Sequence, residues 1–329
     1  MSDFMRTLCK IAIPVTLQGM LQASFSIVDQ IMIGQLGEAG IAAVGLCGNF
    51  TLIFSVMSGA VGTVAGILIA QFLGAEEHTE AWRSLDVSLV CGGVLAALFL
   101  LAAGGFPAQI LGLYTADDAI LRVGAGYFRI VAFSYLPMAV SGVLSAWLRC
   151  KEHAAIPCLA SLGAVAANTG LNYLLIFGKL GLPVMGISGA AIATLVSQLL
   201  NLGLIVAGFW VCLRKEERPV WSLRFKKLTL QAYGGMVLPI LVSEFLWSLG
   251  QNVESAVYGH LGTASLAAYT LTCPLQSLIM GALSGLSAVA GVMVGKQLGK
   301  KDYAAAYGDA QKLMAAGLVG SVAVSALLV

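Results

Sequence analysis

The chain contains a long internal repeat, which constrains its fold more than any other feature of the sequence. Without a gap, the residues from Pro14 onward recur 225 positions later, from Pro239 onward. Aligned pairs further along the two copies include Asp29 with Glu254, Gly34 with Gly259, and Ala42 with Ala267. Both copies are strongly apolar, so the repeat predicts a duplicated membrane protein.

Nine apolar segments are long enough to cross the hydrocarbon layer, which takes roughly 20 helical residues. The chain is 59% hydrophobic and 10% charged, and soluble domains of ordinary size could not bury so much apolar surface. Membrane strands would be shorter and would alternate in polarity. We therefore expect an all-α, polytopic membrane protein. Its expected spans are 10–34, 41–73, 85–106, 120–148, 154–178, 186–213, 229–259, 265–297 and 311–329.

The repeat divides the expected spans into two lobes. Six spans form an N-lobe over residues 1–213, a cytoplasmic linker covers 214–227, and about three spans form a partial C-lobe over 228–329. Half of the second repeat is therefore missing. Either the sequence is a fragment of a twelve-helix protein, expected to be a monomer when complete, or it is a natural short form that needs a partner to complete its second lobe.

The distribution of Lys and Arg predicts the orientation of the chain. Fifteen of the 18 lie in the N-terminal segment, in the expected loops after the second, fourth, sixth and eighth spans, or close to them. Arg149 is assigned here to the loop 149–153. The opposite face has only Arg122, Arg129 and Lys179, which predicts a cytoplasmic N-terminus and a multi-pass protein of the cytoplasmic membrane. The net charge of +2 follows from this asymmetry, so nucleic acid is not an expected partner.

Four polar residues fall at similar depth inside the expected N-lobe. An ionisable group in hydrocarbon is costly and needs a reason, and Asp29 lies within the first span. Asn168 and Asn172 share one face of the fifth span, and Thr194 lies in the sixth. Their oxygens could hold a small cation such as Na⁺, or Asp29 could accept a proton with neutral support. Alternatively, the two asparagines only join helices by hydrogen bonds.

The seventh span contains a second group of polar and aromatic residues. Glu244, Trp247 and Gln251 follow helical spacing, and Glu254 lies one turn further. A carboxylate beside an indole suits an amphipathic organic cation in a substrate cavity. The alternatives are that Glu254 is solvated near the outer interface and that Trp247 is a packing residue.

Two prolines at equivalent positions of the repeat are candidate hinges. Pro14 and Pro239 each lie inside an expected helix, where proline frees a carbonyl and favours a bend. A static kink is the alternative to a moving hinge.

These features indicate a class of function. Internal repeats around a site at mid-membrane depth are typical of secondary transporters. No nucleophile with a base, and no cluster of metal ligands, is visible in the sequence, so we expect no catalytic residues, no enzyme activity and no cofactor.

Three segments together resemble the multidrug and toxic compound extrusion (MATE) transporters. They are Pro14 with Val28-Asp29-Gln-Ile-Met-Ile-Gly34, Asn168-Thr-Gly-Leu-Asn172, and Gly189-Ala-Ala-Ile-Ala-Thr194. The resemblance implies a two-lobed exporter of twelve helices that exchanges H⁺ or Na⁺ for amphipathic, often cationic, drugs and toxins. It also implies a cation site in the N-lobe at Asp29, Asn168 and Thr194.

Two residues depart from the family pattern. Asn172 stands where many relatives have a second Asp, which reduces the negative charge of the site and leaves the coupling ion open. Trp247 occupies the place where another branch has an acidic residue, for which Glu244 is at best an offset substitute.

We therefore expect a MATE-like exporter of small molecules, with a lipid-linked oligosaccharide flippase of the same superfamily as the alternative. Such a flippase should have a cationic cavity, whereas Arg129 is the one basic residue that the sequence suggests is buried. An inactive remnant is a further alternative.

Overall fold

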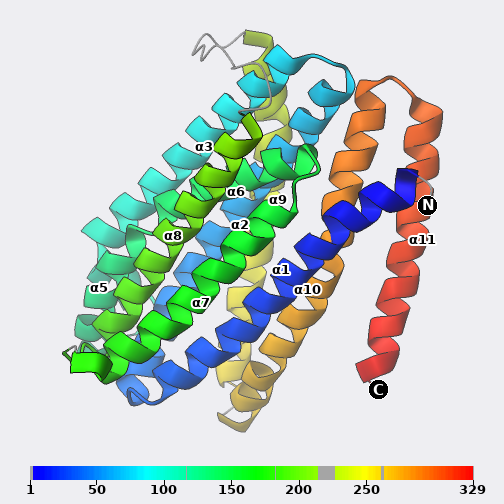
Figure 1. The fold of residues 1–329 in the computed structure, drawn as a ribbon. Coiled ribbons are helices and arrows are strands. Elements are labelled where there is room, and N and C mark those ends of the chain that lie inside the picture. Colours follow the sequence, from blue (N-terminus) through cyan, green and yellow to red (C-terminus); the bar gives the residue numbers. More distant parts are fainter. Residues whose placement is uncertain (1–2, 116, 182, 214–226, 261–262, 329) are drawn as a thin grey trace.

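The fold is helical throughout the part of the chain that the computed structural model describes, which is residues 3–115, 117–181, 183–213, 227–260 and 263–328. A helix satisfies its own backbone amides, as hydrocarbon requires. The expected linker 214–227 lies outside this part except for Lys227. The elements, shown in Figure 1, are α1 (Asp3–Gly34), α2 (Glu38–Gly74), α3 (His78–Gly105), α4 (Pro107–Gly112), α5 (Asp118–Ala132), α6 (Tyr135–Cys150), α7 (Ala155–Phe177), η1 (Lys179–Gly181), α8 (Ile187–Leu213), α9 (Lys227–His260), α10 (Thr263–Gly299) and α11 (Tyr303–Leu328).

The sequence repeat corresponds to a repeated unit of three helices. α2 and α10 are both 37 residues long. Their first residues, Glu38 and Thr263, lie 225 positions apart. The starts of α1 and α9, and those of α3 and α11, keep this offset to within one residue. The starts of the helices therefore repeat at the same offset as the sequence.

Within the residues that the structure describes, seven helices are long and apolar enough to span a membrane, and eight spans result if one bent pair is counted together. The bent pair is α5 and α6, which together cover the expected span 120–148 as two helices that meet at 40° instead of one continuous helix. Pro137, in the first turn of α6, explains the break, because its ring would collide with the carbonyl of Phe133 in a continuous helix. The ninth expected span, 311–329, falls in α11, which does not meet the same test over its described side chains.

The basic ends of the helices gather at one end of the molecule. Figure 1 shows the start of α1 and the turns α2–α3, α6–α7 and α10–α11 at the same end. Lys10, Lys296 and Lys151 belong to these segments. The arrangement agrees with the grouping of charges that the sequence suggested.

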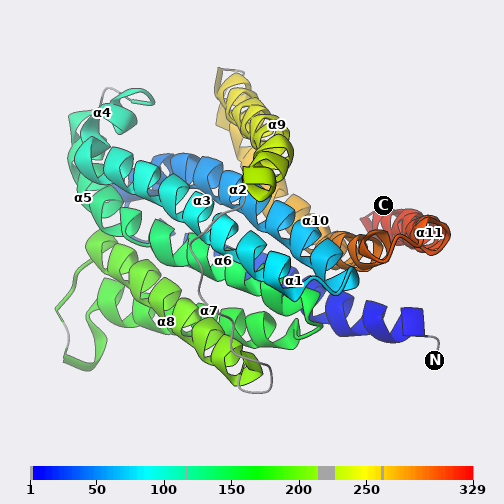
Figure 2. The same cartoon turned by 90° about the horizontal axis from the view of Figure 1, so that it is seen from above.

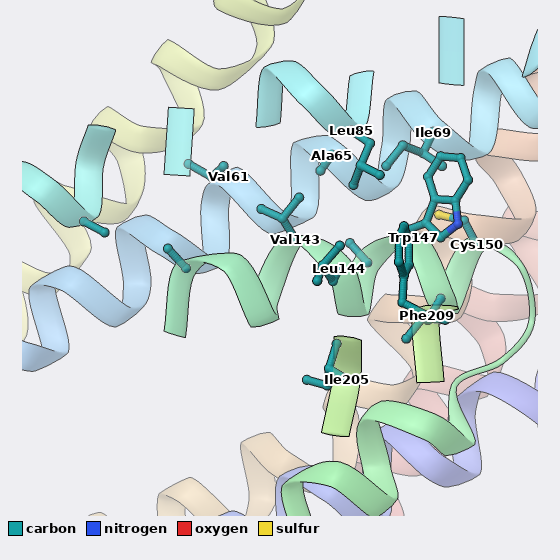
Figure 3. Close-up of a cluster of buried hydrophobic side chains, with 14 of the residues drawn as sticks. Val61, Ala65, Ile69, Leu85, Val143, Leu144, Trp147, Cys150, Ile205 and Phe209 are labelled. Atoms are coloured by element: carbon teal, nitrogen blue, oxygen red, sulfur yellow. The ribbon is translucent and has the colours of Figure 1, made fainter. Parts of the chain in front are cut away.

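The largest apolar core joins α2, α3, α6 and α8 (Figure 3). Trp147 of α6 is buried against two aromatic rings: its centroid lies 4.1 Å from that of Trp82 and 6.4 Å from that of Phe209. Val143 and Leu144 precede it on the same helix and contact this core. α6 is thereby held in the middle of the N-terminal bundle.

Glycines allow α10 to approach both α1 and α2. A Cβ atom on Gly281 would lie 2.8 Å from the carbonyl carbon of Gly19, and one on Gly285 would overlap the backbone of Ala12. Near the other end of α10, a Cβ on Gly299 would overlap the backbone of Gln71 in α2. Small residues are the usual means of close helix contact in membranes. The second copy of the repeat is thus packed tightly against the first.

Candidate functional site

The carboxylate of Asp29 lies where α1 meets α7. The Asn172 side-chain nitrogen donates a hydrogen bond of 2.7 Å to Asp29 Oδ1. Asn172 is only 1% exposed, so its amide is held in place by the surrounding helices. The structure therefore brings together two of the residues that the sequence singled out.

Asn168 completes this group from one turn earlier on α7. Its side-chain oxygen accepts a hydrogen bond of 3.2 Å from Asn172, and its nitrogen donates one of 3.4 Å to Ser197. If the amide is turned over, its nitrogen instead lies 2.9 and 3.1 Å from the two oxygens of Asp29 and can donate to them. The first orientation turns an amide oxygen toward the carboxylate oxygens, with no hydrogen between these acceptors. The second directs the amide nitrogen at the carboxylate, so it is the orientation that the hydrogen-bonding groups favour.

Thr194 of α8 lines the same cavity as Asp29 and Asn168. Its hydroxyl donates a hydrogen bond of 3.0 Å to the carbonyl of Ala190, and the hydroxyl of Tyr127 on α5 forms a hydrogen bond with Thr194. The cavity has a volume of about 460 Å³ and is bounded by α1, α2, α7 and α8. Its lining residues are Gln22, Asp29, Ser55, Ser161, Ala164, Val165, Asn168, Thr194, Ser197, Gln198 and Asn201.

Helix α8 presents a polar stripe to this cavity and an apolar face to the outside. Thr194, Ser197 and Asn201 follow helical spacing and line the cavity. On the opposite side, Val196 and Leu199 are exposed, as expected of a face covered by lipid. Sequence reasoning found Thr194 but missed Ser197, Gln198 and Asn201, although their spacing was the signal.

Two amide oxygens near the site have no hydrogen-bond partner in the described part of the chain. They are Oδ1 of Asn172 and Oδ1 of Asn201, and both are buried. Buried acceptors are normally satisfied. Together with the carboxylate of Asp29, they give the site one negative charge and several neutral oxygens, a set that matches a monovalent cation or a proton.

The four expected cavity residues of the second copy lie on α9. Glu244 and Gln251 are half-buried there, whereas Trp247 and Glu254 are exposed. α9 packs on α2, α3 and α10. Figure 2 shows it on the far side of α2 and α3 from α7 and α8. The structure therefore keeps these residues apart from the Asp29 group.

The two candidate hinges lie inside unbroken helices. Pro14 falls within α1 and Pro239 within α9. Their role in motion stays a prediction.

The placement of two basic residues differs from the sequence expectation. Arg129 is exposed on α5, so the suggestion that it is buried is wrong. Arg149, assigned to a loop, belongs to the last turn of α6 and lines a second cavity. Hydropathy marked only the apolar part of this helix and left out its charged last turn.

A family model named MatE matches residues 14–174 and again 239–329. The two matches begin 225 positions apart, as the repeat does. They cover most of the chain.

Individual relatives agree with the family match. The chain is 28% identical over 314 residues to "Probable multidrug resistance protein NorM" of Agrobacterium fabrum, covering 92% of this chain and 65% of the relative. It is 23% identical over 316 residues to a NorM protein of Thermotoga maritima, again covering 92% and 65%. The chain thus spans about 65% of the length of these curated relatives.

Solved structures show the same fold. A structure described as the outward-facing conformation of a multidrug resistance MATE family transporter of the MOP superfamily superimposes with a TM-score of 0.88 at 18% identity. The match covers 99% of this chain and 72% of that structure. Family and fold agree, and the chain belongs to the MatE family of transporters.

Proposed function

We propose that this protein is a secondary active transporter that exports amphipathic, cationic organic compounds by exchange for H⁺ or Na⁺. The observation that carries the proposal is the hydrogen bond from Asn172 to Asp29, beside a polar cavity lined by Asp29, Asn168 and Thr194. The names of the NorM relatives support drugs and toxins as substrates.

In this proposal Asp29 alternates between a neutralised and a free carboxylate. A proton or Na⁺ on Asp29 removes the negative charge, and the oxygens of Asn168, Asn172 and Thr194 supply neutral support. When the ion leaves, the amides of Asn168 and Asn172 donate hydrogen bonds to the bare carboxylate, at 2.9 Å for Asn168 and 2.7 Å for Asn172.

The charge of the site bears on which ion is used. With Asn172 in place of a second acid, a bound cation meets one negative charge only, so the attraction for a dehydrated Na⁺ is weak. Protonation of Asp29 is then the easier way to neutralise it, and we propose proton coupling. No other cofactor is part of the proposal.

The energetics follow from the exchange. If one monovalent ion enters for each monovalent drug that leaves, no net charge crosses the membrane. The membrane potential, worth about 2.3 kcal/mol per charge per 100 mV, then contributes nothing, and the ion gradient alone drives export.

The remaining elements of the proposal concern the substrate and the setting. Glu244, Trp247 and Gln251 on α9 would contact the drug through charge neutralisation and an aromatic face. The basic ends of the helices favour a cytoplasmic N-terminus in the plasma membrane. The transporter would act as a monomer.

Efflux of ethidium from cells tests the proposal. Asp29→Asn should abolish efflux while the protein still inserts, because the variant cannot carry the ion charge. Asp86→Asn is the matched control, since Asp86 is another half-buried acid in a membrane helix, α3, and does not line the Asp29 cavity. Efflux by the Asp29 variant at the rate of the control would refute the proposed role.

A further inference from the structure

A second cavity of about 450 Å³ lies between the two copies of the repeat. Its walls come from α1, α2 and α6 of the first copy's bundle and from α10 of the second. The lining residues are Val15, Gly62, Thr63, Gly66, Ile67, Ala146, Arg149, Ser284, Ser287, Ala288, Gly291 and Val292. None of them lines the Asp29 cavity.

The packing of α6 directs Arg149 into this space. The Cys150 thiol donates a hydrogen bond of 3.2 Å to the carbonyl of Gly66, and Trp147 is 2% exposed in the apolar core. With these two residues held against α2 and the core, Ala146 and Arg149, one turn apart, line the cavity.

No described residue balances the charge of Arg149. It forms no ion pair or hydrogen bond within the part of the chain that the structure describes. The acid closest to it along the chain, Glu152, is already engaged by Lys296 at 3.0 Å and by Lys10 at 3.8 Å. Charged residues in membrane helices are normally paired or serve a function.

The other walls supply hydroxyl groups and apolar surface. Thr63 and Ser287 are both exposed into the cavity, and neither hydroxyl has a hydrogen-bond partner among the described residues. Ser284 donates to the carbonyl of Gly281 at 2.7 Å and keeps its oxygen free to accept. Val15, Ile67 and Val292 form the apolar part. The volume falls in the range of small-molecule sites, about 300–1,000 Å³, and is far larger than a single chloride requires.

We infer that Arg149 binds the anionic group, a carboxylate or a phosphate, of a small amphipathic molecule whose apolar part contacts Val15, Ile67 and Val292. The guanidinium forms charge-assisted hydrogen bonds with the anion, and Thr63 and Ser287 donate further hydrogen bonds. The source is either a water-soluble organic anion or the headgroup of an anionic lipid. This inference goes beyond the cation exchange proposed above and does not rest on it.

Calorimetric titration of the chain in phosphatidylcholine nanodiscs tests the inference, with the heat from empty discs subtracted. The probes are octanoate, octylammonium and octanol, which share a tail and differ in charge. Octanoate should bind more tightly than the other two. Arg149→Gln should weaken octanoate binding by about tenfold or more, whereas Arg149→Lys should retain part of it.

A second variant keeps the inference testable if the charge change disturbs folding. A Cβ on Gly291 would meet open space, so Gly291→Leu should fill the cavity and weaken octanoate binding with every charge in place. Arg129→Gln, which removes an exposed Arg elsewhere, is the control and should bind octanoate like the wild type. Equal octanoate affinity of the wild type, Arg149→Gln and Gly291→Leu would overturn the inference, as would a lack of octanoate binding by the wild type.

A second set of discs, which contain phosphatidylglycerol, distinguishes the two possible sources of the anion. If an anionic lipid occupies the site, octanoate should bind more weakly to the wild type in these discs. If a soluble anion is the ligand, octanoate affinity should be the same in both lipids. These titrations measure binding at equilibrium and involve no transport. A result that overturns anion binding would therefore leave the cation-exchange proposal intact.

Discussion

The side-chain amide of Asn172 donates a 2.7 Å hydrogen bond to the carboxylate of Asp29, 143 residues away in the sequence. The bond joins α1 to α7 at the edge of a polar cavity. It uses the amide nitrogen of Asn172 and leaves its oxygen without a described partner. Asn172 thus orients the carboxylate of Asp29 and has a free oxygen that could be a further ligand of a bound cation.

Asn172→Asp should shift the protein toward sodium. A second carboxylate beside Asp29 doubles the negative charge available to a cation, so the apparent affinity for Na⁺ should rise by about tenfold. Ethidium efflux with and without Na⁺ at fixed pH measures the change. Asn252→Asp, which adds an acid on α9 instead, should leave sodium dependence unaltered. Strict sodium dependence in the wild type would show that the missing acid does not select the ion.

Thr194→Val should weaken ion coupling without unfolding the bundle. The substitution keeps the shape of the side chain and removes the hydroxyl that lines the Asp29 cavity and bonds Ala190 and Tyr127. Loss of one such group costs about 1 kcal/mol, or roughly a fivefold drop in ion affinity. Thr51→Val is the comparison, because the Thr51 hydroxyl bonds Cys47 and Tyr135 outside this cavity. The idea fails if both variants lower the pH sensitivity of efflux alike.

Gly285→Ala should destabilise the contact between α1 and α10. The added methyl group would overlap Ala12 and Thr16, so the helices must separate, at a cost of about 1–3 kcal/mol. The identical change at Gly45 of α2 meets nothing within 4 Å and should be neutral or slightly stabilising. Thermal unfolding followed by tryptophan fluorescence compares the two. Equal melting temperatures would mean that the two copies are not packed this closely.

Glu152→Gln should slightly lower the free energy of unfolding, because it weakens the contacts at the basic end of the molecule. Burial alone would raise the pKa of Glu152, but the hydrogen bond from Lys296 and the charges of Lys296, Lys10 and Arg6 lower the pKa below its ordinary value. A lowered pKa means that the ionised Glu152 stabilises the folded state at pH values above its pKa in the unfolded chain, about 4.3. This stabilisation is lost as the pH falls through the pKa of the folded state. Because the side chains are partly exposed, the effect at neutral pH should stay below about 1 kcal/mol.

The control for this change is Glu76→Gln in the α2–α3 turn. Glu76 has the same left-handed backbone, with φ of 61° against 62° for Glu152. It is exposed and has no ion pair among the described residues. The difference in thermal stability between the wild type and Glu152→Gln should be smaller at pH 3 than at pH 7. A difference that is independent of pH would point to the turn geometry instead of the charges.

The sequence predicted the helices well because lipid leaves the backbone few alternatives. A shift of 225 residues places the starts of α1–α3 within one residue of the starts of α9–α11. Helix ends were predicted less well, since hydropathy marks the part in hydrocarbon and misses charged turns such as the one that holds Arg149. The break at Phe133 was missed although Pro137 gave a signal for it.

The convergence of Asp29, Asn168 and Asn172 was predictable because each is a costly polar group at similar depth. Gln198 and Asn201 were not recognised, since a single amide in a membrane helix is usually a packing residue. Their role in the cavity depends on the rotation of α8, which tertiary packing sets. That Arg149 has no ion-pair partner among the described residues could be seen only after those residues had been placed.

Transport by purified protein in liposomes tests the central claim most directly. An imposed pH gradient, in the absence of Na⁺, should drive ethidium transport by the wild type and by Asp86→Asn, and no gradient-driven transport should remain in Asp29→Asn. Transport by Asp29→Asn at the wild-type rate and with the same dependence on the gradient would contradict the claim that Asp29 carries the coupling ion.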